Sequence, residues 1–136
     1  MCGIRSLIAS DLADDRGSSP VEFVLVGTML TVLTLGVLQF GLSVYVRNVV
    51  HDAAVEGAYH AALADTSLKD GAARTREIVS RTVGDGYETE VEVRDTRVLG
   101  HDSVAVTVHA TLPLLGLLGV PRAMEVTAHA PVESFD

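Results

Sequence analysis

Two histidines, His109 and His129, are the first residues in this sequence whose types and spacing could do chemistry. Each lies in a segment where polar and apolar residues alternate, so both imidazoles can face one side of neighbouring strands and invite a metal ion. Zinc needs three or four ligands, and neither the single cysteine, Cys2, nor the spacing of the other histidines completes a set. We therefore interpret both histidines as solvent-facing and expect no metal and no cofactor.

Catalytic motifs are absent from the sequence, which contains no Gly-x-Ser-x-Gly elbow, no phosphate loop and no paired nucleophile and base. Glu88, Glu90 and Glu92 lie on one face of a strand-like segment, where like charges discourage edge pairing and indicate a solvated edge. The formal net charge of -8 leaves no basic patch for phosphates, which argues against a nucleic-acid partner. The sequence thus predicts a protein that is not an enzyme.

Glu22 is the carboxylate with the most unusual setting, because it directly precedes a charge-free apolar run from Phe23 to Val46. A bilayer core requires about 20 apolar residues in a helix, and Ser and Thr hydroxyls inside such a helix can bond to its backbone. The run therefore predicts one transmembrane helix rather than the buried helix of a small soluble protein. Glu22 then lies in the headgroup zone or opposite a charged partner, and the residues alone leave both readings open.

The residues around Glu22 resemble a known processing site. Gly17-Ser18-Ser19-Pro20-Val21-Glu22-Phe23, followed by an apolar helix, is similar to the processing site of type IV pilin-like proteins. Within that superfamily it most resembles the TadE-like pseudopilins of the tight-adherence (Flp) pilus system. The resemblance implies that a prepilin peptidase cuts between Gly17 and Ser18, removes the leader (residues 1–17) and leaves the anchor in the membrane.

The same resemblance implies roles for Glu22 and Phe23, which form the pair preceding the helix. Glu22 would be the fifth residue of the mature chain and would pair with the N-terminal amine of a neighbouring subunit during assembly. Other implied partners are the membrane, pilin-like subunits and assembly-platform proteins. The implied topology is single-pass, with the N-terminus cytoplasmic and the C-terminal domain extracytoplasmic, in a component of pilus assembly or a related secretion machine.

Small residues along the apolar run form a candidate helix-packing stripe. Gly27, Thr34 and Gly41 recur every seven residues with Thr31 on the same face, and such residues let another helix approach closely. Glycine is also frequent in membrane helices without any partner, so the pattern alone leaves this role open.

The remainder of the chain predicts an α+β domain. An amphipathic helical extension runs to about Asp65, with Asp52, Glu56 and His60 on one face. Its other face consists of apolar and small residues at helical spacing: Val46, Val49, Val50, Ala53, Gly57 and Ala61. A short second helix is expected over residues 72–83. Alternation then indicates a small three-stranded antiparallel sheet, each strand buried on one face, over residues 87–94, 103–112 and 124–130. The predicted parts are the leader (1–17), the processing-site region and transmembrane helix (18–46), and an extracytoplasmic stem with its α+β domain (47–136).

One connection supports a competing hypothesis. Residues Pro113 to Pro121 are almost wholly apolar, whereas loops are normally polar, so this segment either covers the sheet or contacts the membrane or a partner. On the second reading the chain is a single-pass membrane-anchored extracytoplasmic module that binds a protein and is unrelated to pili.

Overall fold

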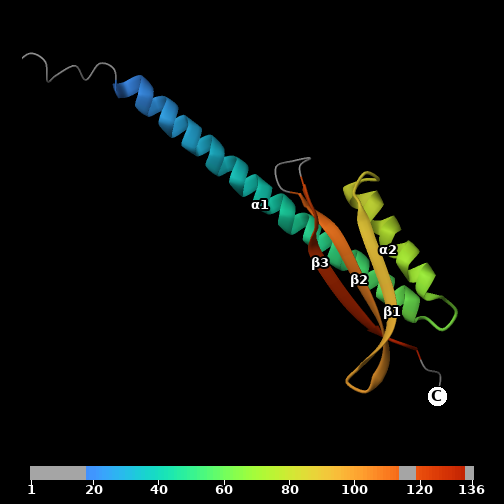
Figure 1. Cartoon of the computed structure of the whole chain (residues 1–136). Coiled ribbons are helices and arrows are strands. Elements are labelled where there is room, and N and C mark those ends of the chain that lie inside the picture. Colours follow the sequence, from blue (N-terminus) through green and yellow to red (C-terminus); the bar gives the residue numbers. More distant parts are fainter. Residues whose placement is uncertain (1–17, 114–118, 134–136) are drawn as a thin grey trace, which may run out of the picture. The chain divides into compact units, whose positions relative to one another are not determined.

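The computed structural model describes residues 18–113 and 119–133 and confirms the α+β fold (Figure 1). The described residues form two helices and then three strands: α1 (Ser18–Ala62), α2 (Leu68–Val83), β1 (Thr89–Val98), β2 (His101–Pro113) and β3 (Gly119–Pro131). The chain separates into two compact units, one up to Leu38 and one from Gln39 onward, so α1 contributes to both.

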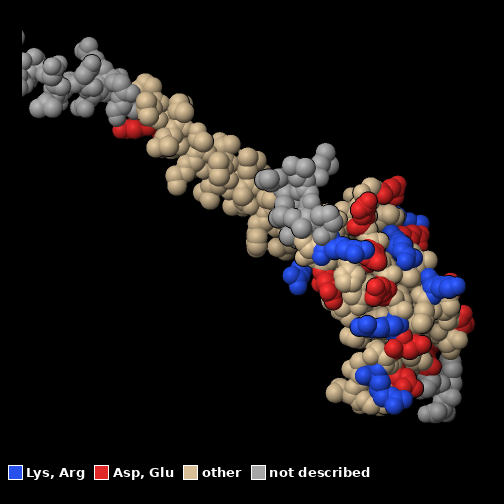
Figure 2. All heavy atoms as spheres, in the orientation of Figure 1, with Lys and Arg blue, Asp and Glu red and all other residues tan. Residues whose placement is uncertain are grey.

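The first unit contains the beginning of α1, in which large apolar side chains face outward. Phe23 is 80% exposed and Met29 is 74% exposed. Figure 2 shows this part of the helix without charged side chains beyond the acidic one near its start. Among the described residues, one helix is long and apolar enough to cross a membrane. A helix that is apolar on all sides and that no other described residue covers fits a single-pass membrane anchor.

The hydroxyls of the apolar run bond to the helix backbone, as the sequence predicts. Thr28 Oγ1 donates to the Val24 carbonyl at 2.7 Å, and Thr34 Oγ1 donates to the Leu30 carbonyl at 2.8 Å. These bonds matter in lipid, because a hydroxyl without a hydrogen-bond partner there costs on the order of several kcal/mol, like any other buried polar group.

The second helix begins four residues earlier than predicted, at Leu68 instead of Ala72. Its start is a capping box, in which the Ser67 hydroxyl accepts from the Asp70 backbone N–H at 3.3 Å while Asp70 accepts from the Ser67 backbone N–H at 2.9 Å. The prediction relied on the apolar periodicity, which begins only at Ala72, and it overlooked this polar signal.

The sheet has the order β1-β2-β3 with both pairs antiparallel, as predicted. Val108 at its centre pairs with Val91 on one side and Val126 on the other. All three strands are longer than the alternating segments that indicated them. The turn between β1 and β2 consists of Leu99 and Gly100, whose φ angles of 50° and 87° match a tight two-residue hairpin.

The central strand differs from the prediction of one-sided burial. Its inner residues are buried, but Ser103, Ala105 and Thr107 on the outer face are also less than 10% exposed. These side chains are small and flanked on both sides: Ala105, for example, lies opposite Arg94 on β1 and His129 on β3. Longer neighbours on the edge strands therefore shield the outer face of β2 from water.

The core of the second unit joins the last turns of α1, α2 and the inner sheet face. It is built mainly from alanine and valine, including Val50, Ala54 and Ala58 of α1, Val79 of α2 and Val106 of β2. The buried stripe of α1 confirms the predicted amphipathic extension and is wider than predicted, because Ala54 and Ala58 are buried as well. Small residues let α1 pack closely against its neighbours.

The tightest contact in this core is the approach of α1 to α2. A Cβ added at Gly57 would lie 2.9 Å from the Gly71 carbonyl oxygen, and one added at Gly71 would lie 2.7 Å from the Gly57 carbonyl oxygen. The two backbones can approach this closely only because neither residue carries a side chain.

Candidate functional site

The predicted processing and assembly residues lie at the start of α1. Gly17 is outside the described residues, and the helix begins at Ser18. Pro20 is tolerated here because the first turn has no intrahelical acceptors for its missing N–H. Glu22 is exposed and lies four residues after Ser18, so the two positions share one helix face. The roles of Gly17, Ser18, Glu22 and Phe23 remain predictions.

The four residues of the predicted packing stripe share one face of α1. At 3.6 residues per turn, Gly27, Thr31, Thr34 and Gly41 fall within an arc of about 80°. A Cβ added at Gly27 or Gly41 would meet no described atom within 4 Å. The Thr31 hydroxyl donates to the Gly27 carbonyl at 2.8 Å, so this side chain presents mainly its methyl group outward. The stripe is therefore smooth and meets no other part of the described chain at its glycines, and its role in helix packing remains a prediction.

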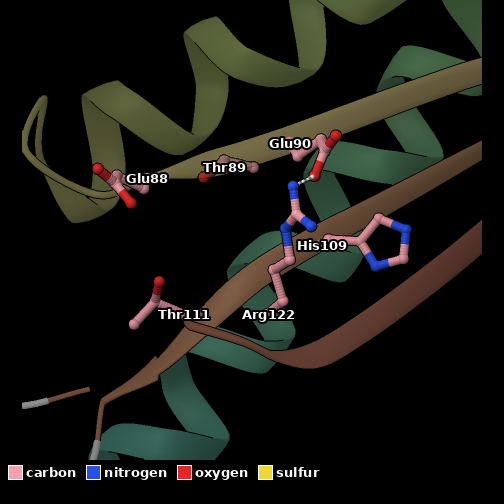
Figure 3. A pocket seen from close by; sticks show the side chains of 6 residues that line it. All are labelled: Glu88, Thr89, Glu90, His109, Thr111 and Arg122. Atoms are coloured by element: carbon pink, nitrogen blue, oxygen red, sulfur yellow. Dashed lines mark ion pairs between the residues drawn. The ribbon is translucent and has the colours of Figure 1, made fainter. Parts of the chain in front are cut away.

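A polar depression lies on the outer sheet face of the second unit (Figure 3). Its lining residues are Glu88, Thr89, Glu90, His109, Thr111 and Arg122. Arg122 extends from β3 across β2, and its Nη2 lies 2.7 Å from Glu90 Oε2 on β1. Both side chains are about half exposed or more, so the pair is worth at most about 1 kcal/mol. The geometry is that of a solvated brace across the sheet.

Arg122 was not among the residues predicted from the sequence. Its φ of 55° is unusual for a residue with a side chain, and it lies next to the irregular pairing between β2 and β3 near Ala110 and Leu112. This backbone conformation is set by pairing across strands, which no local pattern reports. The predicted solvated acidic edge is confirmed, since Glu88, Glu90 and Glu92 are all exposed, and Glu90 in addition pairs with Arg122.

The two histidines lie on the outer sheet face, but far from each other along it. His109 pairs with Glu90 and Glu125, and its Nδ1 lies 4.0 Å from Glu125 Oε2. His129 pairs with Ala105, four residues along β2, which is about 13 Å at 3.3 Å per residue. The two imidazoles therefore cannot share an ion. Within residues 18–113 and 119–133, no three His, Cys, Asp or Glu side chains gather in a way that could hold a metal.

Charged residues also connect the exposed sides of α1 and α2. Arg74 lies 3.4 Å from Glu56 of α1 and 3.3 Å from Glu77 of its own helix. Hydrogen bonds from the Ser67 side chain and backbone lower the pKa of Asp70, with a smaller contribution from the charge of His60. These exposed contacts orient α2 against α1 and provide no nucleophile or proton relay.

Comparison with known families places a match on the N-terminal part of the chain. Residues 17–58 match the model of the TadE-like protein family. This match confirms the resemblance drawn from the sequence, and it covers most of α1 and the start of the predicted processing region. No curated protein and no solved structure matches the chain.

Proposed function

We propose, from the TadE-like character of residues 17–58, that this chain is a non-catalytic, pseudopilin-like component of Tad/Flp pilus assembly or a related secretion machine. The family match is the observation that carries the proposal. In it the apolar run of α1 crosses the membrane once, with the N-terminus in the cytoplasm and residues from Arg47 onward outside it.

Processing by a prepilin peptidase is the first step of the proposed function. The family match starts at Gly17 and α1 starts at Ser18, which supports a cut between them. The cut would leave a cationic amine at the beginning of a helix, where the helix dipole is also positive. Such an amine is unfavourable in lipid unless an anion lies near it.

Glu22 supplies that anion in the proposed assembly. Its carboxylate, like the amine, loses favourable hydration near lipid. Two opposite charges in low dielectric offset part of each other's desolvation cost. Pairing the Glu22 carboxylate of one subunit with the Ser18 amine of its neighbour sets the two helices in one register. The stripe formed by Gly27, Thr31, Thr34 and Gly41 would then let those helices pack closely.

The test replaces Glu22 by alanine in the full-length protein, expressed with its native assembly system. We expect insertion to be unchanged, as measured by resistance to alkaline extraction, because the apolar run is intact. Cross-linking to pilin-like subunits should fall strongly. Asp52→Ala is the matched control, since it removes an exposed carboxylate of α1 beyond the run. Normal assembly of Glu22→Ala would refute the role of Glu22.

A further inference from the structure

A groove lies between α1 and the edge strand β3. Three residues of α1 line one wall and three of β3 line the other: Arg47, Asn48, His51, Glu125, Val126 and Thr127. Val126 is buried, whereas the five polar residues are exposed. All six belong to the second unit, so the groove lies within one compact body.

The two walls carry complementary chemistry. On α1, Arg47 and His51 are four residues apart and therefore face the same side, with the Asn48 amide beside them. A guanidinium, an amide and an imidazole N–H are donors suited to phosphate oxygens. On β3, Glu125 lies at the outer rim of the groove, because the adjacent Val126 faces the core. Its carboxylate is 64% exposed and lies 4.0 Å from Nδ1 of His109, its neighbour on β2. Glu125 would repel a simple anion but would attract an ammonium group.

The groove also has a defined position along α1 relative to the apolar run. Arg47 is the first charged residue after that run, and residues 39–46 of the run belong to the same unit as the groove. A bilayer that takes the run into its hydrocarbon core therefore brings Arg47 and His51 into the headgroup layer. Tyr45, half exposed at the end of the run, is a residue type that favours this interface.

We propose that this groove binds the headgroup of phosphatidylethanolamine. The phosphate accepts hydrogen bonds from Arg47, Asn48 and His51, and the ammonium group faces Glu125. Binding would fix the rotation of the domain about the axis of α1 at the membrane surface. The inference rests on the membrane anchoring of α1 in the proposed function and adds a lipid partner to it.

The test uses the full chain in nanodiscs of equal parts phosphatidylethanolamine and phosphatidylglycerol, with native mass spectrometry of the lipids retained after release. We expect wild type to retain the ethanolamine lipid roughly fivefold over the glycerol lipid, the ratio expected for one exposed charge pair. Glu125→Gln should bring this ratio to about one, while Arg47→Gln should lower retention of both lipids. Glu90→Gln, on the same sheet but outside the groove, should leave the ratio unchanged.

Three outcomes would overturn the inference. Equal retention of the two lipids by wild type would exclude selectivity, and preference for phosphatidylglycerol would make the groove a plain anion site. An unchanged ratio in Glu125→Gln would remove the ammonium contact. None of these three results contradicts the proposed function, because the chain would still be inserted in the bilayer. A chain that is extracted from the bilayer at alkaline pH would instead refute the anchoring, and the lipid site with it.

Discussion

The close approach of α1 and α2 makes Gly57→Ala the most informative substitution in the second unit. The added methyl group would overlap Thr75 Oγ1 and lie 2.9 Å from the Gly71 carbonyl oxygen. Thr75 is fully buried and donates to that same carbonyl at 3.0 Å, so it cannot move aside without losing this bond. Overpacking of this kind costs about 1–3 kcal/mol, and the better helix propensity of alanine returns about 1 kcal/mol. We therefore expect a net destabilisation of about 1 kcal/mol.

A double-mutant cycle with Thr75→Ala isolates the overlap. Thr75→Ala alone should cost about 1–2 kcal/mol through lost packing and its hydrogen bond, and it should relieve most of the overlap when combined with Gly57→Ala. The double variant should therefore be more stable than the sum of the single effects by about 1 kcal/mol. Additive effects would show that the overlap is not what destabilises Gly57→Ala.

The assay is hydrogen exchange of the α2 amides in the full chain in detergent micelles. A loss of about 1 kcal/mol should accelerate exchange about fivefold. Gly36→Ala is the control, because a Cβ at that position would meet no described atom within 4 Å, and α2 exchange should not change. Slower α2 exchange in Gly57→Ala would refute the reasoning, since propensity would then outweigh packing.

Further predictions concern the cap of α2, the Tyr87 hydroxyl and the turn between β1 and β2. The hydrogen bonds from Ser67 lower the pKa of Asp70, so the folded state gains stability above the ordinary carboxyl pKa of about 4 and loses it as pH falls through the lower folded-state value. Exchange at the start of α2, relative to its end, should accelerate on acidification in wild type but not in Asp70→Asn. Tyr87→Phe removes the hydroxyl that donates to the Thr111 carbonyl and should cost about 1 kcal/mol, read as a lower thermal midpoint. Burial raises the pKa of Tyr87. The contribution of the neutral hydroxyl to stability should therefore be complete below a pH of about 10 and decline as the pH rises through the raised pKa. Leu99 is 94% exposed and has a φ of 50°, a conformation that asparagine tolerates better than leucine or alanine. Leu99→Asn should therefore add about 1 kcal/mol of stability and raise the thermal midpoint, whereas Leu99→Ala should not.

Local patterns predicted the elements well, because each has a strong one-dimensional signal. The charge-free run indicated α1, and the alternation of valine with polar residues indicated the three strands. The missed first turn of α2 also had a local signal, the spacing of Ser67 and Asp70, which apolar periodicity does not contain. Local chemistry therefore accounts for the order and type of the elements, whereas the strand ends and the start of α2 differ from the predicted bounds.

Features that depend on tertiary neighbours could not be predicted in this way. Gly57 was placed on the small-residue face of α1, but nothing in the sequence identified Gly71 as its partner across the crossing. The burial of Ala105 depends on long side chains from two other strands, and the Arg122–Glu90 pair spans the whole sheet. The apolar connection between Pro113 and Pro121 lies largely outside the described residues, so its role, and the competing binding-module hypothesis, remain predictions.

The mature N-terminus, determined by mass spectrometry of the chain expressed with and without its native prepilin peptidase, tests the proposed function most directly. The account predicts a chain that begins at Ser18 when the peptidase is present and retains residues 1–17 when it is absent. An intact leader under both conditions would contradict it. Glu22 would then have no neighbouring amine to pair with, and the chain would be a membrane-anchored domain outside the pilin-like pathway.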